Sequence, residues 1–135
     1  MNARAWEGTL ADPRGVIESL CDEPVHSVLR IFSKAGSVRS NHYHKTDWHI
    51  CYVVSGRMEY YALDRDGHKL PEVRTVLAGE YVHTGPNVEH TTVFPEDTVL
   101  LVFAGNKRDR EGYEDDLVRV GNLAERIWQG EFHRA

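Results

Sequence analysis

The chain has 135 residues, enough for one compact domain with a core and too few for two domains of ordinary size. It carries 16 lysines and arginines against 21 aspartates and glutamates, and no basic cluster that would neutralise a row of phosphates, so we expect no nucleic-acid partner. No apolar run approaches the length of a membrane span, and residues 1–15 lack the apolar core of a secretory signal. We therefore expect a cytoplasmic protein without a membrane contact.

Short apolar runs rich in β-branched and aromatic residues fill residues 25–113, separated by turn signals such as KAGS, DRDG and TGPN. This pattern indicates an all-β fold, an antiparallel sandwich or barrel. In the run 57–64, alternation places Met58, Tyr60 and Ala62 on one face. The expected strands are residues 26–32, 40–44, 48–56, 57–64, 75–79, 80–84, 89–94 and 98–105.

Two segments follow the expected strands. The charged stretch NKRDREGYEDD, residues 106–116, has little apolar content and is interpreted as a solvated loop or a lid. The later stretch NLAERIWQG has apolar residues at helical spacing, with Asn122 available as an N-cap and Gly130 as a C-terminal stop. We expect one short amphipathic helix over about residues 122–129, packed on the barrel or on a partner subunit.

Three of the eight histidines lie close together, in the stretch SNHYHKTDWHICYVVSG. Residues two apart on a strand point to the same face, so His42 and His44 form a chelating pair. His49 heads the next strand, and His90 heads a later strand after the turn TGPN. Because several rings converging in a core are costly to desolvate, these four histidines predict a metal site. Imidazole ligands suit one divalent ion of Zn, Fe, Ni, Mn, Co or Cu.

Two segments carry a resemblance to a known family. Residues 36–56 look like the first motif of the cupin family, in which a glycine, a His-x-His pair, a glutamate and a second glycine follow at set intervals. Residues 79–94, with a Pro-containing turn before His90, are similar to the second cupin motif. The resemblance implies a single cupin domain over residues 1–135, a jelly-roll β-barrel of two packed antiparallel sheets with the metal inside. Many small cupins pair through edge strands, so it also implies a homodimer.

The chain departs from the family pattern at the predicted metal site. His49 stands where the family has glutamate, so the resemblance implies four histidine ligands in place of three histidines and a carboxylate. Asp47, two residues earlier and out of register, is the alternative source of a carboxylate. In the second motif Asn87 stands where a glycine is usual, and asparagine tolerates the positive φ that such a turn requires.

The function implied by the resemblance is enzymatic. The chain resembles small cupins of nucleotide-sugar and polysaccharide biosynthesis, some of which are isomerases or epimerases. We therefore expect an enzyme acting on a small carbonyl- or hydroxyl-bearing substrate such as a sugar, with the metal stabilising an enediolate. Two alternatives stay open, an Fe(II)-dependent cupin dioxygenase and a non-catalytic, metal-stabilised sugar-binding or sensor module.

An isomerase also needs a group that moves a proton near the metal. Tyr60 and Cys51 are the ionisable side chains that strand parity turns inward if His49 points inward. His83 and Glu89 are further catalytic candidates at the mouth of the barrel. A packing role is the competing interpretation for Tyr60 and Cys51.

Overall fold

The computed structural model describes residues 10–67 and 70–132 of the chain. Most of its regular structure is β-strand, as the sequence predicts. The first strands are β1 (Leu10–Asp12), β2 (Gly15–Ile17), β3 (Ser27–Ser33), β4 (Val38–His44), β5 (His49–Ser55) and β6 (Arg57–Asp64). They are followed by β7 (Glu72–Leu77), β8 (Tyr81–Thr84), β9 (Val88–Val93), β10 (Thr98–Ala104), α1 (Arg110–Asp116), β11 (Leu117–Arg119) and α2 (Leu123–Trp128).

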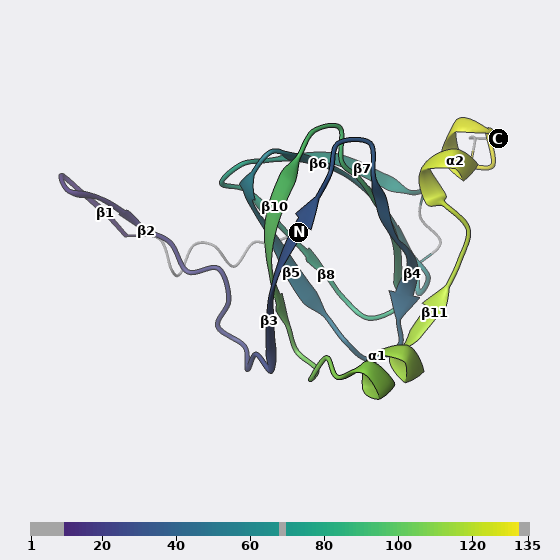
Figure 1. Ribbon diagram of the computed structural model, residues 1–135, viewed down its shortest axis with the longest axis horizontal. Coiled ribbons are helices and arrows are strands. Elements are labelled where there is room, and N and C mark those ends of the chain that lie inside the picture. Colours follow the sequence, from purple (N-terminus) through teal and green to yellow (C-terminus); the bar gives the residue numbers. More distant parts are fainter. Residues whose placement is uncertain (1–9, 68–69, 133–135) are drawn as a thin grey trace.

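Two antiparallel sheets wrap around a common interior (Figure 1). One sheet has the strand order β3-β10-β5-β8, and the other has the order β11-β4-β9-β6-β7. Strands β1 and β2 pair only with each other, and this small hairpin projects away from the barrel. The predicted all-β jelly-roll type of barrel with a short C-terminal helix is confirmed.

All eight strands expected from the sequence occur, and the strand at 57–64 has the expected bounds. The stretch 106–116, interpreted as a loop or lid, instead contains α1. This helix begins where the side chain of Asp109 accepts a hydrogen bond from the backbone N–H of Gly112, at 2.7 Å. Five of its seven residues are charged and none of the seven is buried, so no apolar periodicity marks the helix in the sequence.

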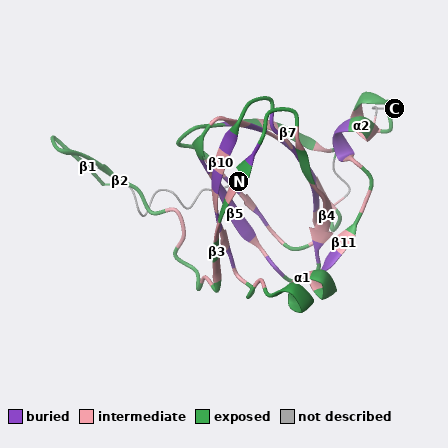
Figure 2. Ribbon diagram, in the orientation of Figure 1, coloured by how far each residue is buried: buried purple, intermediate pink, exposed green. Residues whose placement is uncertain are grey.

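Strand alternation builds the core as the sequence predicts. Met58, Tyr60 and Ala62 belong to the buried cluster between the sheets, whereas Tyr61 points outward and packs against Leu123 of α2. Figure 2 shows buried segments on the strands of the barrel and on the part of α2 that faces them. The C-terminal helix therefore packs on the barrel, and the side chain of Asn122 caps it by accepting from the backbone N–H of Glu125.

The sheet register brings distant histidines together. His42 of β4 lies opposite His90 of β9, next to a register shift between Ser40 and His42. Ser40 and Asn41 have φ values of 75° and 56° at this irregularity, as expected for a β-bulge. His49 begins β5 in the opposite sheet, so histidines from both sheets lie at the end of the barrel that α1 and β11 flank (Figure 1).

A bilayer-crossing helix does not occur within the described residues.

Candidate metal centre and cavity

Three histidine side chains converge from two paired strands. His42 and His44 come from β4 and His90 from β9, and each offers one ring nitrogen in a group whose atoms all lie within 4.8 Å of one another. The ring centroid of His42 lies 4.9 Å from that of His44 and 4.8 Å from that of His90. Strand parity accounts for the pairing of His42 with His44, and the β4–β9 register adds His90.

Two of these histidines present a free ring nitrogen. The Nδ1 atom of His90 lies 2.9 Å from the carbonyl oxygen of Val88, and that of His44 lies 3.2 Å from a carboxylate oxygen of Asp116. Since oxygen acceptors require a proton on each Nδ1, each Nε2 keeps its lone pair. Both Nε2 atoms are buried and have no hydrogen-bond partner among the described residues. An unpartnered buried nitrogen is costly, and a bound metal ion removes that cost, so these residues fit a metal.

Burial keeps these rings in the neutral form that binds metals. It lowers the pKa of His42 to about 3, with the neighbouring His90 as the next contribution. Burial also lowers the pKa of His90 to about 4, although the hydrogen bond to the backbone of Val88 by itself raises that pKa. At neutral pH neither ring needs to lose a proton before it coordinates an ion.

His49 lies beside this group. Its ring centroid is 5.1 Å from that of His90 and 5.9 Å from that of His44. It is not a member of the group whose nitrogens lie within 4.8 Å, and its Nδ1 lies 3.4 Å from a guanidinium nitrogen of Arg108. The structure thus brings the rings of the four predicted ligands together and places one ring nitrogen from each of three of them within 4.8 Å of the others. The four-histidine ligand set stays a prediction.

The alternative carboxylate ligand, Asp47, faces a different set of partners. One of its oxygens accepts from the backbone N–H of Asn106 at 2.8 Å, and the other accepts from Nε of Arg108 at 3.1 Å. Asp47 also forms a group with His44 and Asp116, all within 4.8 Å. Both Asp47 oxygens are thus hydrogen bonded to residues of the 106–116 stretch, and its role as a metal ligand stays a prediction.

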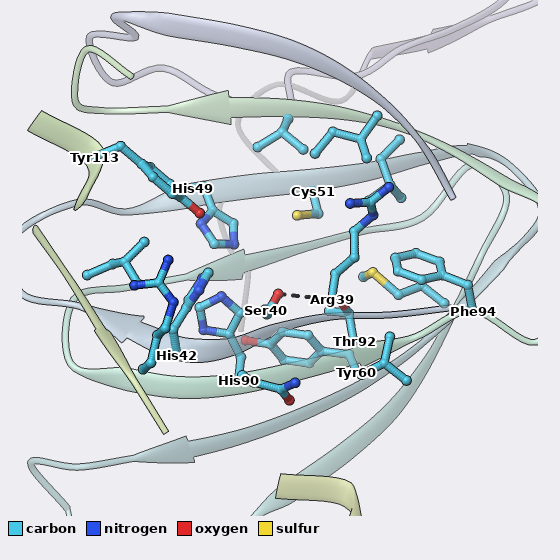
Figure 3. A pocket seen from close by; sticks show the side chains of 18 of the residues that line it. Arg39, Ser40, His42, His49, Cys51, Tyr60, His90, Thr92, Phe94 and Tyr113 are labelled. Atoms are coloured by element: carbon cyan, nitrogen blue, oxygen red, sulfur yellow. Dashed lines mark hydrogen bonds between the residues drawn. The ribbon is translucent and has the colours of Figure 1, made fainter. Parts of the chain in front are cut away.

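The histidines open onto an internal cavity of about 410 Å³. Figure 3 shows His42, His49 and His90 at one end of this space and Phe94 at the opposite end. The cavity therefore combines one end where histidine nitrogens gather with a second end where apolar side chains lie beside Arg39. The apolar part of the wall includes Ile31, Met58, Phe94, Leu100 and Val102.

Residues 30–104 match the family model described as the cupin domain. The chain belongs to the cupin family. The comparison with curated proteins found no match.

Several solved structures resemble this cupin. The 3,4-ketoisomerase QdtA from Thermoanaerobacterium thermosaccharolyticum, a double mutant in complex with TDP, is 23% identical with a TM-score of 0.62, over 82% of this chain and 81% of that one. The dTDP-4-dehydrorhamnose 3,5-epimerase from Sulfolobus tokodaii is 20% identical with a TM-score of 0.64, over 84% and 73%. WlaRA, a TDP-fucose-3,4-ketoisomerase from Campylobacter jejuni, is 15% identical with a TM-score of 0.65, over 82% of each chain. At such identities the likeness establishes a shared fold.

Two of the catalytic candidates lie on the cavity wall of this cupin. Cys51 is buried, and burial raises the pKa of its thiol to about 12. The hydroxyl of Tyr60 lies 2.8 Å from that of Thr84, and burial raises the pKa of Tyr60 above its ordinary value. Both groups therefore hold their protons at neutral pH, which suits proton donors better than proton acceptors.

The other two candidates lie elsewhere. The Glu89 carboxylate is bound between Arg65 and Arg126, at 2.9 Å from each, on the side of β9 that α2 covers. The ring of His83 stacks on that of Trp48, with 5.7 Å between centroids and 14° between planes. Neither side chain is part of the cavity wall. Their catalytic roles remain predictions. The contacts that the structure shows are ion pairs for Glu89 and a stacked ring for His83.

The sequence reasoning overlooked the contribution of the stretch 106–116. Arg108 and Tyr113 line the cavity, and Asp116 contacts His44. The Tyr113 ring lies 5.7 Å from that of His44. A charged segment is usually solvated, and no spacing rule links it to histidines about 60 to 70 residues away, so the sequence carries no signal for these contacts.

Proposed function

We propose that this cupin is a metal-dependent enzyme that isomerises or epimerises a carbonyl-bearing sugar or sugar derivative. The observation that carries the metal part is the pair of buried, unpartnered Nε2 atoms on His44 and His90, with His42 beside them. The substrate class is supported by structures of the same fold whose names denote sugar ketoisomerases and an epimerase. A cavity of about 410 Å³ lies within the range of small-molecule sites and has room for a sugar ring.

The chain's own residues supply binding and proton control. A divalent ion held by His42, His44 and His90 would supply Lewis acidity toward a carbonyl oxygen. The apolar part of the cavity wall, with Phe94 and Leu100, would contact the less polar parts of the substrate. Tyr60 and Cys51 hold protons on the wall, so we assign them as candidates for proton donation to the substrate.

One observation favours a second function, an Fe(II)-dependent dioxygenase. Three histidine nitrogens, in place of four, leave open positions on an octahedral ion for a substrate and for oxygen. Oxygen consumption that depends on Fe(II) would support this reading, whereas an isomerase needs no oxygen. Tight sugar binding without turnover would support the non-catalytic module.

Metal analysis of protein purified without chelators tests the site first. We expect about one ion per chain in the wild type and a loss of the ion in His44→Ala and His90→Ala. His26→Ala is the matched control, because the Nδ1 atom of His26 lies 2.6 Å from the carbonyl oxygen of Gly105, outside the histidine group. Unchanged metal content in both test variants would show that the proposed site is wrong.

Solvent deuterium exchange tests the reaction. In D₂O, an isomerase or epimerase of this type incorporates deuterium at the carbon next to the carbonyl group of a nucleotide-linked keto-sugar. We expect incorporation with the metal-loaded wild type and none with His90→Ala. A metal-loaded protein that labels no member of a broad keto-sugar panel would contradict the proposed activity.

We also propose that the protein forms a homodimer and works in the cytoplasm, as expected from the sequence. The β1–β2 hairpin supports the dimer, because Leu10, Val16 and Ile17 are each at least 65% exposed on an element that pairs with no other strand among the described residues. Such a two-stranded ribbon gains stability from a partner surface. Analytical ultracentrifugation of the full chain should give the mass of two subunits, and a monomer at micromolar concentration would contradict the proposal.

A further inference from the structure

A guanidinium group fixes the position of one ring at the end of the cavity where the histidine nitrogens gather. A terminal nitrogen of Arg108 lies 3.4 Å from Nδ1 of His49 in hydrogen-bonding geometry. Arginine has N–H donors and no acceptor, so Nδ1 of His49 must be the acceptor in this bond. That nitrogen therefore carries no proton, and the single ring proton of His49 lies on Nε2.

Arg108 is itself held from several directions. Its Nε donates to the Asp47 carboxylate at 3.1 Å, and its backbone N–H donates to the hydroxyl of Ser27 at 2.8 Å. Its guanidinium carbon lies 5.1 Å from the centre of the Tyr113 ring. The side chain is only 13% exposed, so these contacts leave it little freedom to release His49.

His49 differs from His44 and His90 in the partner of its Nδ1 atom. In His44 and His90 the Nδ1 atom faces an oxygen acceptor, which leaves Nε2 unprotonated. In His49 the Nδ1 atom faces a donor, which leaves Nε2 with a hydrogen. A nitrogen that bears a hydrogen has no lone pair for a metal ion. His49 lines the cavity, so a hydrogen on its Nε2 is available to a bound molecule.

We propose that Arg108 is a positioning residue that holds His49 in its Nε2–H form, so that His49 presents a hydrogen-bond donor to the cavity and does not ligate the metal. On this assignment the ligands are His42, His44 and His90. The contact between His49 and a substrate oxygen rests on the proposed function. The assignment of the His49 ring hydrogen to Nε2 does not. A hydrogen-bond donor beside a metal-bound carbonyl group would stabilise the carbonyl oxygen as negative charge develops on it.

Nuclear magnetic resonance of ¹⁵N-histidine-labelled protein reads the ring form directly and needs no variant. We expect His49 to show a protonated Nε2 and an unprotonated Nδ1, both before and after Zn²⁺ is added. Arg108→Lys keeps one donor and should preserve this pattern, whereas Arg108→Met should give a mixture of the two neutral forms. A hydrogen on Nδ1 of His49 in the wild type would overturn the proposal.

Zn²⁺ affinity provides the second readout. We expect His49→Gln to bind Zn²⁺ within tenfold of the wild type. We expect His90→Gln, which removes a ligand, to lose more than the roughly 10- to 100-fold that loss of an outer-shell partner costs. A loss of more than tenfold in His49→Gln would identify His49 as a ligand and overturn the proposal. Both measurements use the protein without sugar, so a failure to turn over any keto-sugar would contradict the proposed function and leave this result standing.

Discussion

The Nδ1 atom of His44 lies 3.2 Å from a carboxylate oxygen of Asp116, which follows it by 72 residues in the chain. Asp116 is held in turn by Thr46, whose backbone N–H and hydroxyl donate to it at 2.9 and 2.6 Å. This chain of contacts orients the His44 ring and engages its Nδ1, which leaves the buried Nε2 as the nitrogen without a partner among the described residues. The last residue of α1 thus fixes a proposed metal ligand on β4.

Replacing Asp116 by asparagine should weaken metal binding. Asp116→Asn removes the charge that favours a proton on Nδ1 of His44, and loss of such a partner typically costs about 10- to 100-fold in affinity. Asp115→Asn is the control, because this substitution makes the same change of charge at an exposed position one residue away. Competition with a chromophoric Zn²⁺ chelator measures both variants. Equal affinities for the two would show that Asp116 does not act on the site.

The stability of the metal-free protein should fall as the pH drops below neutrality. Burial lowers the pKa of His90 to about 4 in the folded protein, against about 6.5 in an unfolded chain. Between these values the unfolded state binds more protons, so the free energy of unfolding falls with decreasing pH by up to about 1.4 kcal/mol per pH unit.

Urea denaturation of chelator-treated protein at pH 7.5, 6.0 and 5.0 measures this slope. His90→Gln removes the titrating group, so its free energy of unfolding should depend less steeply on pH in the same range. If the variant and the wild type give parallel curves, His90 does not carry the pH dependence.

Gly56, in the turn between β5 and β6, should tolerate no side chain. Its φ is 91°, and a Cβ atom there would overlap the carbonyl oxygen of Asp97 and the hydroxyl of Thr98. Left-handed strain and overpacking together should cost Gly56→Ala about 2–5 kcal/mol of stability. Gly36→Ala is the matched control, since φ is 88° but the space is open, and it should cost only about 1–2 kcal/mol. Equal losses by urea denaturation would show that the close approach is unimportant.

Glu89→Gln should affect stability and leave the metal site intact. The carboxylate joins Arg65 and Arg126, and with them the turn after β6 to α2, so losing its charge should cost about 2 kcal/mol. Glu131→Gln serves as the control, because Glu131 pairs with Arg126 at an exposed position and should cost less than about 1 kcal/mol. Thermal denaturation and Zn²⁺ titration give the two readouts. A loss of turnover without a loss of stability would restore Glu89 as a catalytic candidate.

Local patterns in the sequence determined much of this protein. A strand alternates with a period of two, so Met58 and Tyr60 were expected on the inner face and His42 and His44 side by side. The cap at Asn122 and the turn residue Asn87, whose φ is 61°, also depend only on near neighbours. His90 was expected at the site from its position at the head of a strand after the turn TGPN, and the second family motif agreed with it.

Contacts between distant segments were decided only by the tertiary structure. Glu89 precedes a proposed ligand yet faces α2, because neighbouring residues on a strand point to opposite faces and Arg126 lies on the outer one. Arg108 and Asp116 come from a stretch whose composition indicates a solvated loop, and they reach the histidines through the closure of the barrel. The sequence by itself places His42 and His44 on one strand face, since parity is a local rule, whereas the strand pairing that brings His90 to them joins distant segments. Which nitrogen of each ring holds the proton depends on partners that only the folded chain brings within hydrogen-bonding distance.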